Sequence, residues 1–427
     1  MRSRRSGRRV ACDSGLRAMW LLGFAAAVAG CRDTAAPDPD RVKFLWFGNE
    51  TETRTIGSLV RAFERDNPGC RVDLTTIEWN RYTEKVVTMM LGGRSPDLAR
   101  MSLQHVARFH DLGALADVSS RFTPEELADF DPARLASCRV GDGLVGLPQS
   151  SIGLVVYYNR DAFRRVGVVP PPTVHDAWTL DEFADVARRL QTEGGMKYGW
   201  GTFRGFFSLM PFLYMYGGSL FGVDLTTPQF SSPPVLDAME WFVDQHRRGI
   251  APPTSWSQGG DNVDRLFVLG RCGMVIHGSW MISNYEKRIR DFDWGVTYLP
   301  RGLHAATNIG GENLVVFRTP RTTAAVRLLK YLTSADAVRT FCSRARFIPP
   351  RLSLLRGPFE YASRGDLMQV VLEQSRVFRP EWGREQSSPA FAVIADQLCA
   401  RTELAILGLC GVPEAMRDLA DDLKGLQ

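Results

Sequence analysis

The chain has 427 residues, which is long enough for two domains with substantial hydrophobic cores. Its hydrophobic fraction of 44% and charged fraction of 23% are those of a globular protein, so disordered, collagen-like and multi-span membrane classes are poor fits. The formal net charge of +5 lies entirely in residues 1–30, because the 46 basic and 46 acidic residues from position 31 onward balance. We therefore expect no nucleic-acid partner.

The beginning of the chain has the pattern of an export signal. A basic stretch, Arg2–Arg17, precedes an apolar run, Ala18–Ala29, that is too short to span a bilayer. Small residues then precede Cys31, which is typical of a lipobox, where the cysteine is diacylated and becomes the new N-terminus. We predict a lipoprotein signal peptide over 1–30, a polar tether over 31–40, and an exported protein anchored by lipid to the outer face of the cell membrane. Paired arginines leave the export route open between general secretion and twin-arginine export.

From residue 41 onward, patterns typical of strands and of helices alternate. The expected strands lie at 42–47, 72–77 and 97–101. Apolar stripes with helical spacing lie at 56–63, 82–90, 180–190 and 235–243. Thr179 and Glu182 have the spacing of a capping box at the start of the third of these helices. This alternation predicts α/β layers with mostly parallel sheets.

Local catalytic motifs are missing from the sequence. There is no G-x-x-x-x-G-K-[ST], no H-E-x-x-H and no G-x-S-x-G, and the histidines are scattered. We therefore expect a protein that is not an enzyme and has no cofactor or metal site. The cysteines after the lipobox leave their disulfide pairing open; they are Cys70, Cys138, Cys272, Cys342, Cys399 and Cys410.

Aromatic residues often stand beside turn-forming residues in this chain. The set comprises Trp46, Trp79, Trp178, Trp200, Trp256, Trp280, Trp294, Phe203 and Tyr216. Aromatic faces stack on sugar rings, whereas polar side chains bind the hydroxyl groups. Any one of these residues could instead pack in a core, but together they favour a binding cleft.

Several short segments resemble a known family, in the same order along the chain. They include Phe63–Gly69, Ser95–Leu98, Leu115–Val118, Gly146–Pro148, Tyr157–Asp161, Trp178–Phe183, Phe267–Met274, Gly278–Trp280 and Gly310–Gly311. Together they resemble the extracellular solute-binding proteins of carbohydrate ABC importers, the group that includes maltose-binding protein. The resemblance extends from Phe44 to about Leu419.

This resemblance implies a two-lobed periplasmic-binding-protein-like α/β fold. Each lobe would be a mostly parallel sheet flanked by helices, with the ligand cleft between the lobes. The chain would cross between lobes near 150–153, 307–310 and 333–337. The first lobe would comprise 41–150 with 309–335, and the second 151–308 with 336–427. A monomer of this kind would capture a sugar or sugar-like solute and deliver it to the transmembrane subunits of an ABC permease.

The resemblance also implies a set of ligand-binding residues. They are Asn49, Glu50, Ser102, Gln104, His105, Gln149, Phe203, Tyr216, Trp280, Gly311, Glu312 and Phe391. From the aromatic residues beside turns we add Trp256 to the expected ligand-binding set. Trp280 corresponds to a stacking platform, and Ser279 is a candidate cap for the helix that follows it. Glu312 either accepts sugar hydroxyls or is a surface acid at the hinge.

Two other functions remain open at this point. The solute could be glycerol phosphate, a polyamine or an iron complex, which would need arginines or acids that converge on the cleft. The chain could also be an exported glycosidase, which would need two carboxylates about 5 to 9.5 Å apart.

Overall fold

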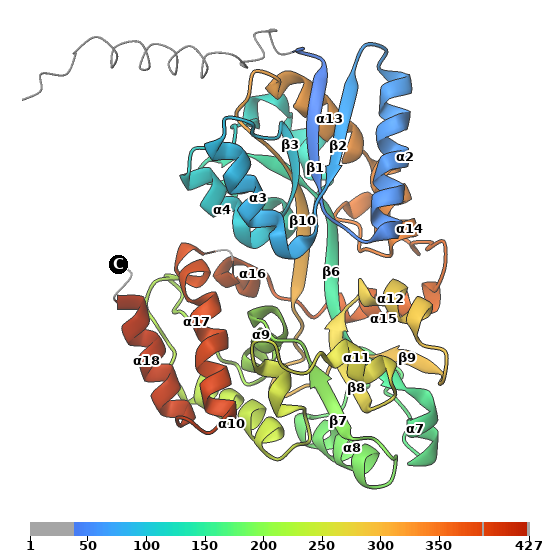
Figure 1. Ribbon diagram of the computed structural model, residues 1–427, viewed down its shortest axis with the longest axis vertical. Coiled ribbons are helices and arrows are strands. Elements are labelled where there is room, and N and C mark those ends of the chain that lie inside the picture. Colours follow the sequence, from blue (N-terminus) through green and yellow to red (C-terminus); the bar gives the residue numbers. More distant parts are fainter. Residues whose placement is uncertain (1–37, 387, 425–427) are drawn as a thin grey trace, which may run out of the picture. The chain divides into compact units, whose positions relative to one another are not determined.

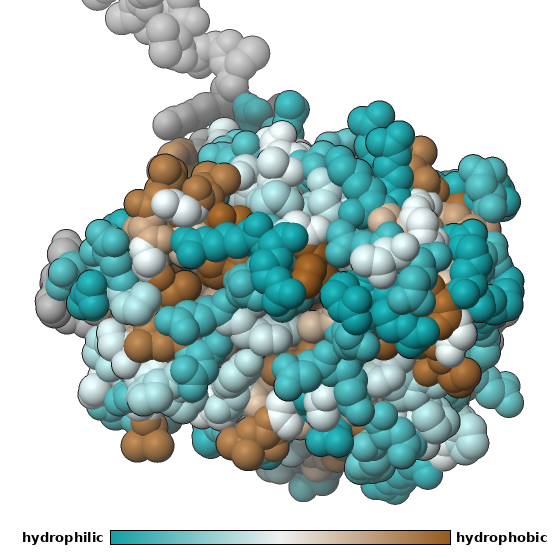
Figure 2. All heavy atoms as spheres, turned by 90° about the horizontal axis from the view of Figure 1, so that it is seen from below, coloured by the Kyte–Doolittle hydropathy of each residue, from teal (hydrophilic) through white to brown (hydrophobic). Residues whose placement is uncertain are grey.

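The computed structural model describes residues 38–386 and 388–424. The fold that these residues form belongs to one compact unit, Pro39–Gln427. The predicted signal peptide and Cys31 lie outside the described residues. None of the described helices has the length and apolar character that a membrane span needs. On the face shown in Figure 2, hydrophilic residues predominate and hydrophobic ones form separate small groups.

The first lobe is built on three parallel strands, β1 (Arg41–Trp46), β2 (Arg71–Thr76) and β3 (Leu98–Ser102). Its helices are α2 (Glu50–Asp66), α3 (Trp79–Leu91), α4 (Leu103–Asp111), α5 (Pro124–Ala128), α6 (Pro132–Ala136), α13 (Thr322–Leu332) and α14 (Ala335–Ala345). A short hairpin of β4 (Arg139–Val140) and β5 (Gly143–Leu144) lies beside them. Helix α2 follows its sequence pattern closely, because the buried stripe holds Ile56, Val60 and Phe63.

Two long strands connect the lobes (Figure 1). The first half of β6 (Gly146–Asn159) pairs with β10 (Ile309–Val316), and its second half pairs with β8 (Cys272–Gly278) and β9 (Trp294–Thr297). Strand β10 also pairs with β3 in the first lobe. Both crossing strands run antiparallel to their neighbours. With β7 (Tyr198–Thr202) at the far edge, the sheet order is β2-β1-β3-β10-β6-β8-β7, and β9 also pairs with β6.

The second lobe places the parallel pair β7 (Tyr198–Thr202) and β8 against a helical shell. Its helices are α7 (Arg160–Arg165), α8 (Leu180–Thr192), α9 (Phe206–Met215), α10 (Pro233–Arg247), α11 (Val263–Val268), α12 (Met281–Arg288), α15 (Gly365–Ser375), α16 (Pro380–Gln386), α17 (Pro389–Ile406) and α18 (Val412–Lys424). The capping box predicted at Thr179 and Glu182 is present at the start of α8. The predicted two-lobed α/β class is confirmed.

The position of the third passage between the lobes depends on which lobe helix α14 joins. Helix α14 packs against α2, and its Phe341 belongs to the same hydrophobic core as Phe63. Beyond it, Ile348 pairs with Ser151 of β6 through two backbone hydrogen bonds of 2.9 and 2.8 Å. The division of the chain at residue 336 stays a prediction, and this packing favours a boundary near Ile348.

The six described cysteines have free thiols, and all except Cys410 are buried. Burial raises the pKa of the thiols of Cys272 and Cys399, to about 12 and about 11. Within the described residues, the structure therefore selects none of the disulfide pairings that the sequence leaves open.

Candidate functional site

A cavity of about 610 Å³ opens between the two lobes. Its first-lobe lining follows the ends of β1, β2 and β3, where parallel strands present their loops. The second lobe contributes the start of α9 and the start of α12, and the crossing strands contribute Ile152 and Gly310–Glu312. One wall is therefore mainly polar and the other mainly aromatic.

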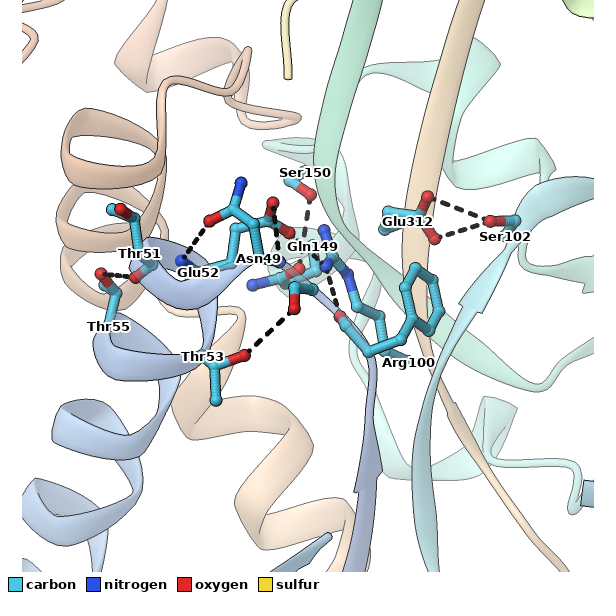
Figure 3. A network of polar contacts seen from close by, with 12 residues as sticks. Asn49, Thr51, Glu52, Thr53, Thr55, Arg100, Ser102, Gln149, Ser150 and Glu312 are labelled. Atoms are coloured by element: carbon cyan, nitrogen blue, oxygen red, sulfur yellow. Dashed lines mark hydrogen bonds and ion pairs between the residues drawn. The ribbon is translucent and has the colours of Figure 1, made fainter. Parts of the chain in front are cut away.

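The polar wall contains a buried ion pair. Arg100 on β3 is 1% exposed, and its Nη1 donates to Glu52 Oε2 at 2.5 Å and to the Phe47 carbonyl at 2.7 Å. Its guanidinium also lies 4.4 Å from the ring centre of Trp46. Glu52 is fixed in turn by the capping box of α2, in which Asn49 is the N-cap (Figure 3). These contacts hold the polar wall rigid before any ligand arrives.

Glu312 lies beside this pair and has different partners. From β10, its carboxylate accepts two contacts from Ser102 Oγ on β3, at 3.0 and 2.8 Å (Figure 3). Burial raises the pKa of Glu312 from its ordinary value of 4.5 to about 7. The charge of Arg100 and the Ser102 hydrogen bond oppose that rise, and the charge of Glu52 adds to it. Glu312 is therefore a carboxyl group that can change charge near neutral pH.

The aromatic wall is assembled from two elements of the second lobe. Trp280 precedes α12, and its ring centre lies 6.2 Å from that of Phe203 and 6.1 Å from that of Phe207. The ring lies directly over Gly278, where a Cβ atom would come within 1.7 Å of Trp280 Cζ3. Glycine at 278 is thus what allows the ring to occupy this place. His277, behind it, contacts Asp264 at 3.4 Å, and burial lowers its pKa.

Many of the sequence-predicted residues come together at this cavity. The ones that line it are Asn49, Ser102, Gln104, Phe203, Trp280, Gly311 and Glu312. They come from both lobes and from a crossing strand, although up to 263 positions separate them in the chain.

Other predicted residues do not line the cavity. Glu50 is exposed and binds Lys287 and Arg54 instead, at 2.9 and 2.5 Å. His105 is packed near the ring of Trp79, with centroids 6.1 Å apart, and burial lowers its pKa. Gln149 is fully buried in β6 and accepts from Ser150 Oγ at 3.3 Å.

Three aromatic residues of the predicted set also lie away from the lining. Tyr216 is half-buried at the end of α9, and Trp256 packs edge-on against Phe242 in the core of the second lobe. Phe391 packs edge-on behind Phe206, with ring centres 5.1 Å apart, and so supports the aromatic wall from outside. None of these three side chains lines the cavity, so their predicted contact with the ligand stays a prediction.

Several lining residues were not in the predicted set. They are Phe47, Glu52, Ile77, Glu78, Trp79, Arg100, Ile152, Phe206, Phe207, Asn284 and Phe347, together with the glycines at 48 and 310. Trp79 was among the aromatic residues noted beside turns, and it is 50% exposed. The run of three phenylalanines at 203, 206 and 207 is a local signal that could have marked the other wall.

The predicted cap at Ser279 is wrong. The N-cap of α12 is Trp280 itself, with no side-chain hydrogen bond. The Ser279 hydroxyl is buried and finds no partner among the described residues. The described residues also contain no cluster of three or more candidate metal ligands.

Comparisons with known proteins agree with this architecture. The maltodextrin-binding protein MdxE of Bacillus subtilis is 22% identical over 377 residues, which cover 86% of each protein. An uncharacterized lipoprotein of Streptomyces antibioticus is 24% identical over 383 residues, covering 85% of this chain and 84% of that protein. The structure of an ABC substrate-binding protein from Listeria monocytogenes, in complex with cycloalternan, aligns with a TM-score of 0.77 and 21% identity over 90% of this chain and 98% of that one. Residues 48–339 match the model of the bacterial extracellular solute-binding protein family, and the chain belongs to that family.

Proposed function

We propose that this protein captures a sugar or sugar-like solute in the cavity between its lobes and delivers it to the permease of an ABC importer. The observation that carries the proposal is the cavity with a polar wall in one lobe and an aromatic wall in the other. Polar groups bind sugar hydroxyls and aromatic faces stack on sugar rings. The similarity to a protein named for maltodextrin supports a saccharide ligand.

Capture follows from the position of the two walls. A solute that contacts both walls binds the closed arrangement of the lobes more tightly than an open one. It therefore shifts the equilibrium toward closure, and the permease can recognise the closed form. Crossing strands β6 and β10 are the segments about which the lobes would move.

We further propose that the protein acts as an exported monomer anchored through lipid on Cys31. The basic and apolar segments that precede Cys31 in the sequence support this, as does the similarity to a lipoprotein of Streptomyces antibioticus. Anchoring would keep the captured solute close to its permease.

The geometry of the cavity does not favour a glycosidase. Such an enzyme needs carboxylates that flank the scissile bond. The carboxylates of the described lining are those of Glu52, Glu78 and Glu312, all on the polar side of the cavity, and Glu52 is paired with Arg100. The described lining residues of the second lobe, which are Phe203, Phe206, Phe207, Trp280 and Asn284, include no carboxylate.

A thermal-shift screen against saccharides tests the proposal directly. A ligand that binds only the folded state at 100 times its Kd adds about 2.7 kcal/mol of stability. Calorimetry on each hit should give one ligand per chain, and small-angle scattering should show compaction. Trp280→Leu should weaken binding, whereas Tyr216→Leu, a matched aromatic replacement outside the lining, should not. A panel in which only non-sugar solutes bind would overturn the proposal, as would turnover of the bound saccharide.

A further inference from the structure

The lining of the interlobe cavity has an imbalance of charge. Three carboxylates line it, from Glu52, Glu78 and Glu312, against a single basic group, that of Arg100. No lysine or histidine joins them in the part of the lining that the structure describes. A solute in this cavity therefore meets a predominantly negative surface.

The guanidinium group of Arg100 already has partners within the protein. Arg100 binds the Glu52 carboxylate at 2.5 Å and the Phe47 carbonyl at 2.7 Å. Four aromatic rings also lie within 5.8 Å of its charged carbon. Arg100 and Glu52 thus neutralise each other, and Arg100 reaches Glu312 only through longer-range attraction.

Glu312 therefore has hydrogen-bonding capacity to spare. It is 8% exposed, lines the cavity, and has the Ser102 hydroxyl as its direct side-chain partner among the described residues. A carboxylate can accept about four hydrogen bonds, so one hydroxyl leaves most of that capacity unused. A buried carboxylate without a directly bound counter-charge is costly, and burial raises the pKa of Glu312 to about 7 although the more distant charge of Arg100 opposes the rise.

The aromatic wall is also suited to a cation. Trp280 and Phe207 line the same cavity as Glu312. Phe207 packs close to Gly310, two residues before Glu312, because a Cβ atom added to Gly310 would lie 3.0 Å from Phe207 Cε2. The negative faces of aromatic rings attract ammonium groups, most strongly where water is excluded. Carboxylate and aromatic faces in one cavity are the combination that recognises an amine.

We propose that the solute carries a protonated amine, as an amino sugar does, and that its ammonium group binds Glu312. This inference rests on the proposed saccharide function and narrows it to a substrate class. The ammonium group supplies the directly bound counter-charge that Glu312 lacks, and the sugar ring lies against Trp280. A neutral sugar can donate a hydroxyl to Glu312 but leaves its charge uncompensated, and an acidic sugar is repelled.

Matched pairs of sugars test the role of the amine. Calorimetry at pH 7 would compare glucose, galactose and mannose with the 2-amino-2-deoxy derivative of each, with N-acetylglucosamine as an uncharged control. We expect at least one amine to bind at least tenfold more tightly than its parent. If in no pair the amine binds more tightly, the inference is overturned. If neutral saccharides bind in that case, the proposed saccharide function still holds. If no member of a wide saccharide panel binds, the proposed function and the amine inference are both overturned.

Two variants separate Glu312 from general electrostatics. Glu312→Gln keeps the shape of the side chain and the acceptor for Ser102, so the preference for the amine should fall to less than about threefold. Glu126→Gln removes the same charge from an exposed site that pairs with Lys330 outside the lining, and should keep the preference. Circular dichroism would verify that both variants are folded. An amine preference that survives in folded Glu312→Gln also overturns the inference.

Discussion

Replacement of Glu312 by glutamine should change how stability depends on pH. Groups from three elements act on this carboxyl: Arg100 and Ser102 on β3, Glu52 on α2, and Tyr82 on α3. Burial dominates them, so the pKa of Glu312 is raised from 4.5 to about 7. Glutamine keeps the side-chain volume and can still accept from Ser102, but it has no charge to desolvate.

The sign and size of the effect follow from linkage between protonation and folding. The folded chain holds the Glu312 proton up to about pH 7, whereas the unfolded chain releases it near 4.5. The wild-type protein therefore loses stability as pH rises through this window, relative to a variant without the group. A full difference between these two pKa values corresponds to roughly 3 kcal/mol. Between pH 4 and pH 8, the free energy of unfolding of Glu312→Gln should therefore rise relative to that of the wild type by up to this amount.

Urea denaturation of both proteins at pH 4 to 8 would measure this difference. Other titrating groups, such as the buried His246, are present in both proteins and largely cancel. Ser102→Ala removes the hydrogen bond that lowers the pKa of Glu312, so its loss of stability should continue to a higher pH than in the wild type and be larger in total. Wild-type and Glu312→Gln curves that stay parallel across this range would refute the argument that burial controls this carboxyl.

Three further changes test other parts of the structure. Trp280→Ala should weaken saccharide binding by about 1–3 kcal/mol, measured by calorimetry, and a folded variant with unchanged affinity would exclude a stacking role. Gly278→Ala should displace the Trp280 ring and lower the free energy of unfolding by about 1–3 kcal/mol, because the added Cβ would lie 1.7 Å from Trp280 Cζ3. Gly153→Ala is the control and should lower that free energy much less, because its added Cβ would meet no atom closer than 3.7 Å. Cys31→Ser should move the protein from the membrane fraction to a soluble or unprocessed pool, and unchanged fractionation would show that Cys31 is not the anchor.

Local patterns in the sequence predicted much of the fold. The stripe over 56–63 became the buried face of α2, and Thr179 with Glu182 forms the capping box of α8. These features depend on neighbours within a few residues, so the sequence displays them directly. The third passage between lobes is hard to locate from the sequence, because α14 is an ordinary amphipathic helix. Only its contact with α2, almost 300 positions away, shows which lobe it joins.

The candidate site was predictable only in part, because long-range packing decides which side chains reach the cavity. Trp280 and Glu312 follow short glycine-containing motifs at strand ends, and both line the cavity. Trp256 stands beside similar turn residues, yet it packs against Phe242 in the core. The place of Arg100 in the cavity could not be predicted, because no local sequence pattern indicates that a buried arginine pairs with Glu52, 48 positions earlier.

The two walls of the cavity differ in what fixes them. The polar wall is held by contacts within the first lobe and the crossing strands, where Asn49, Glu52 and Arg100 are ordered by one another and Glu312 by Ser102. These contacts do not involve the second lobe. The aromatic wall belongs to the second lobe, so a solute held first by the polar wall would gain the aromatic contacts only when the lobes close. Contacts that differ between two states are the ones that shift their equilibrium, so in that order of binding the aromatic wall would supply the free energy of closure.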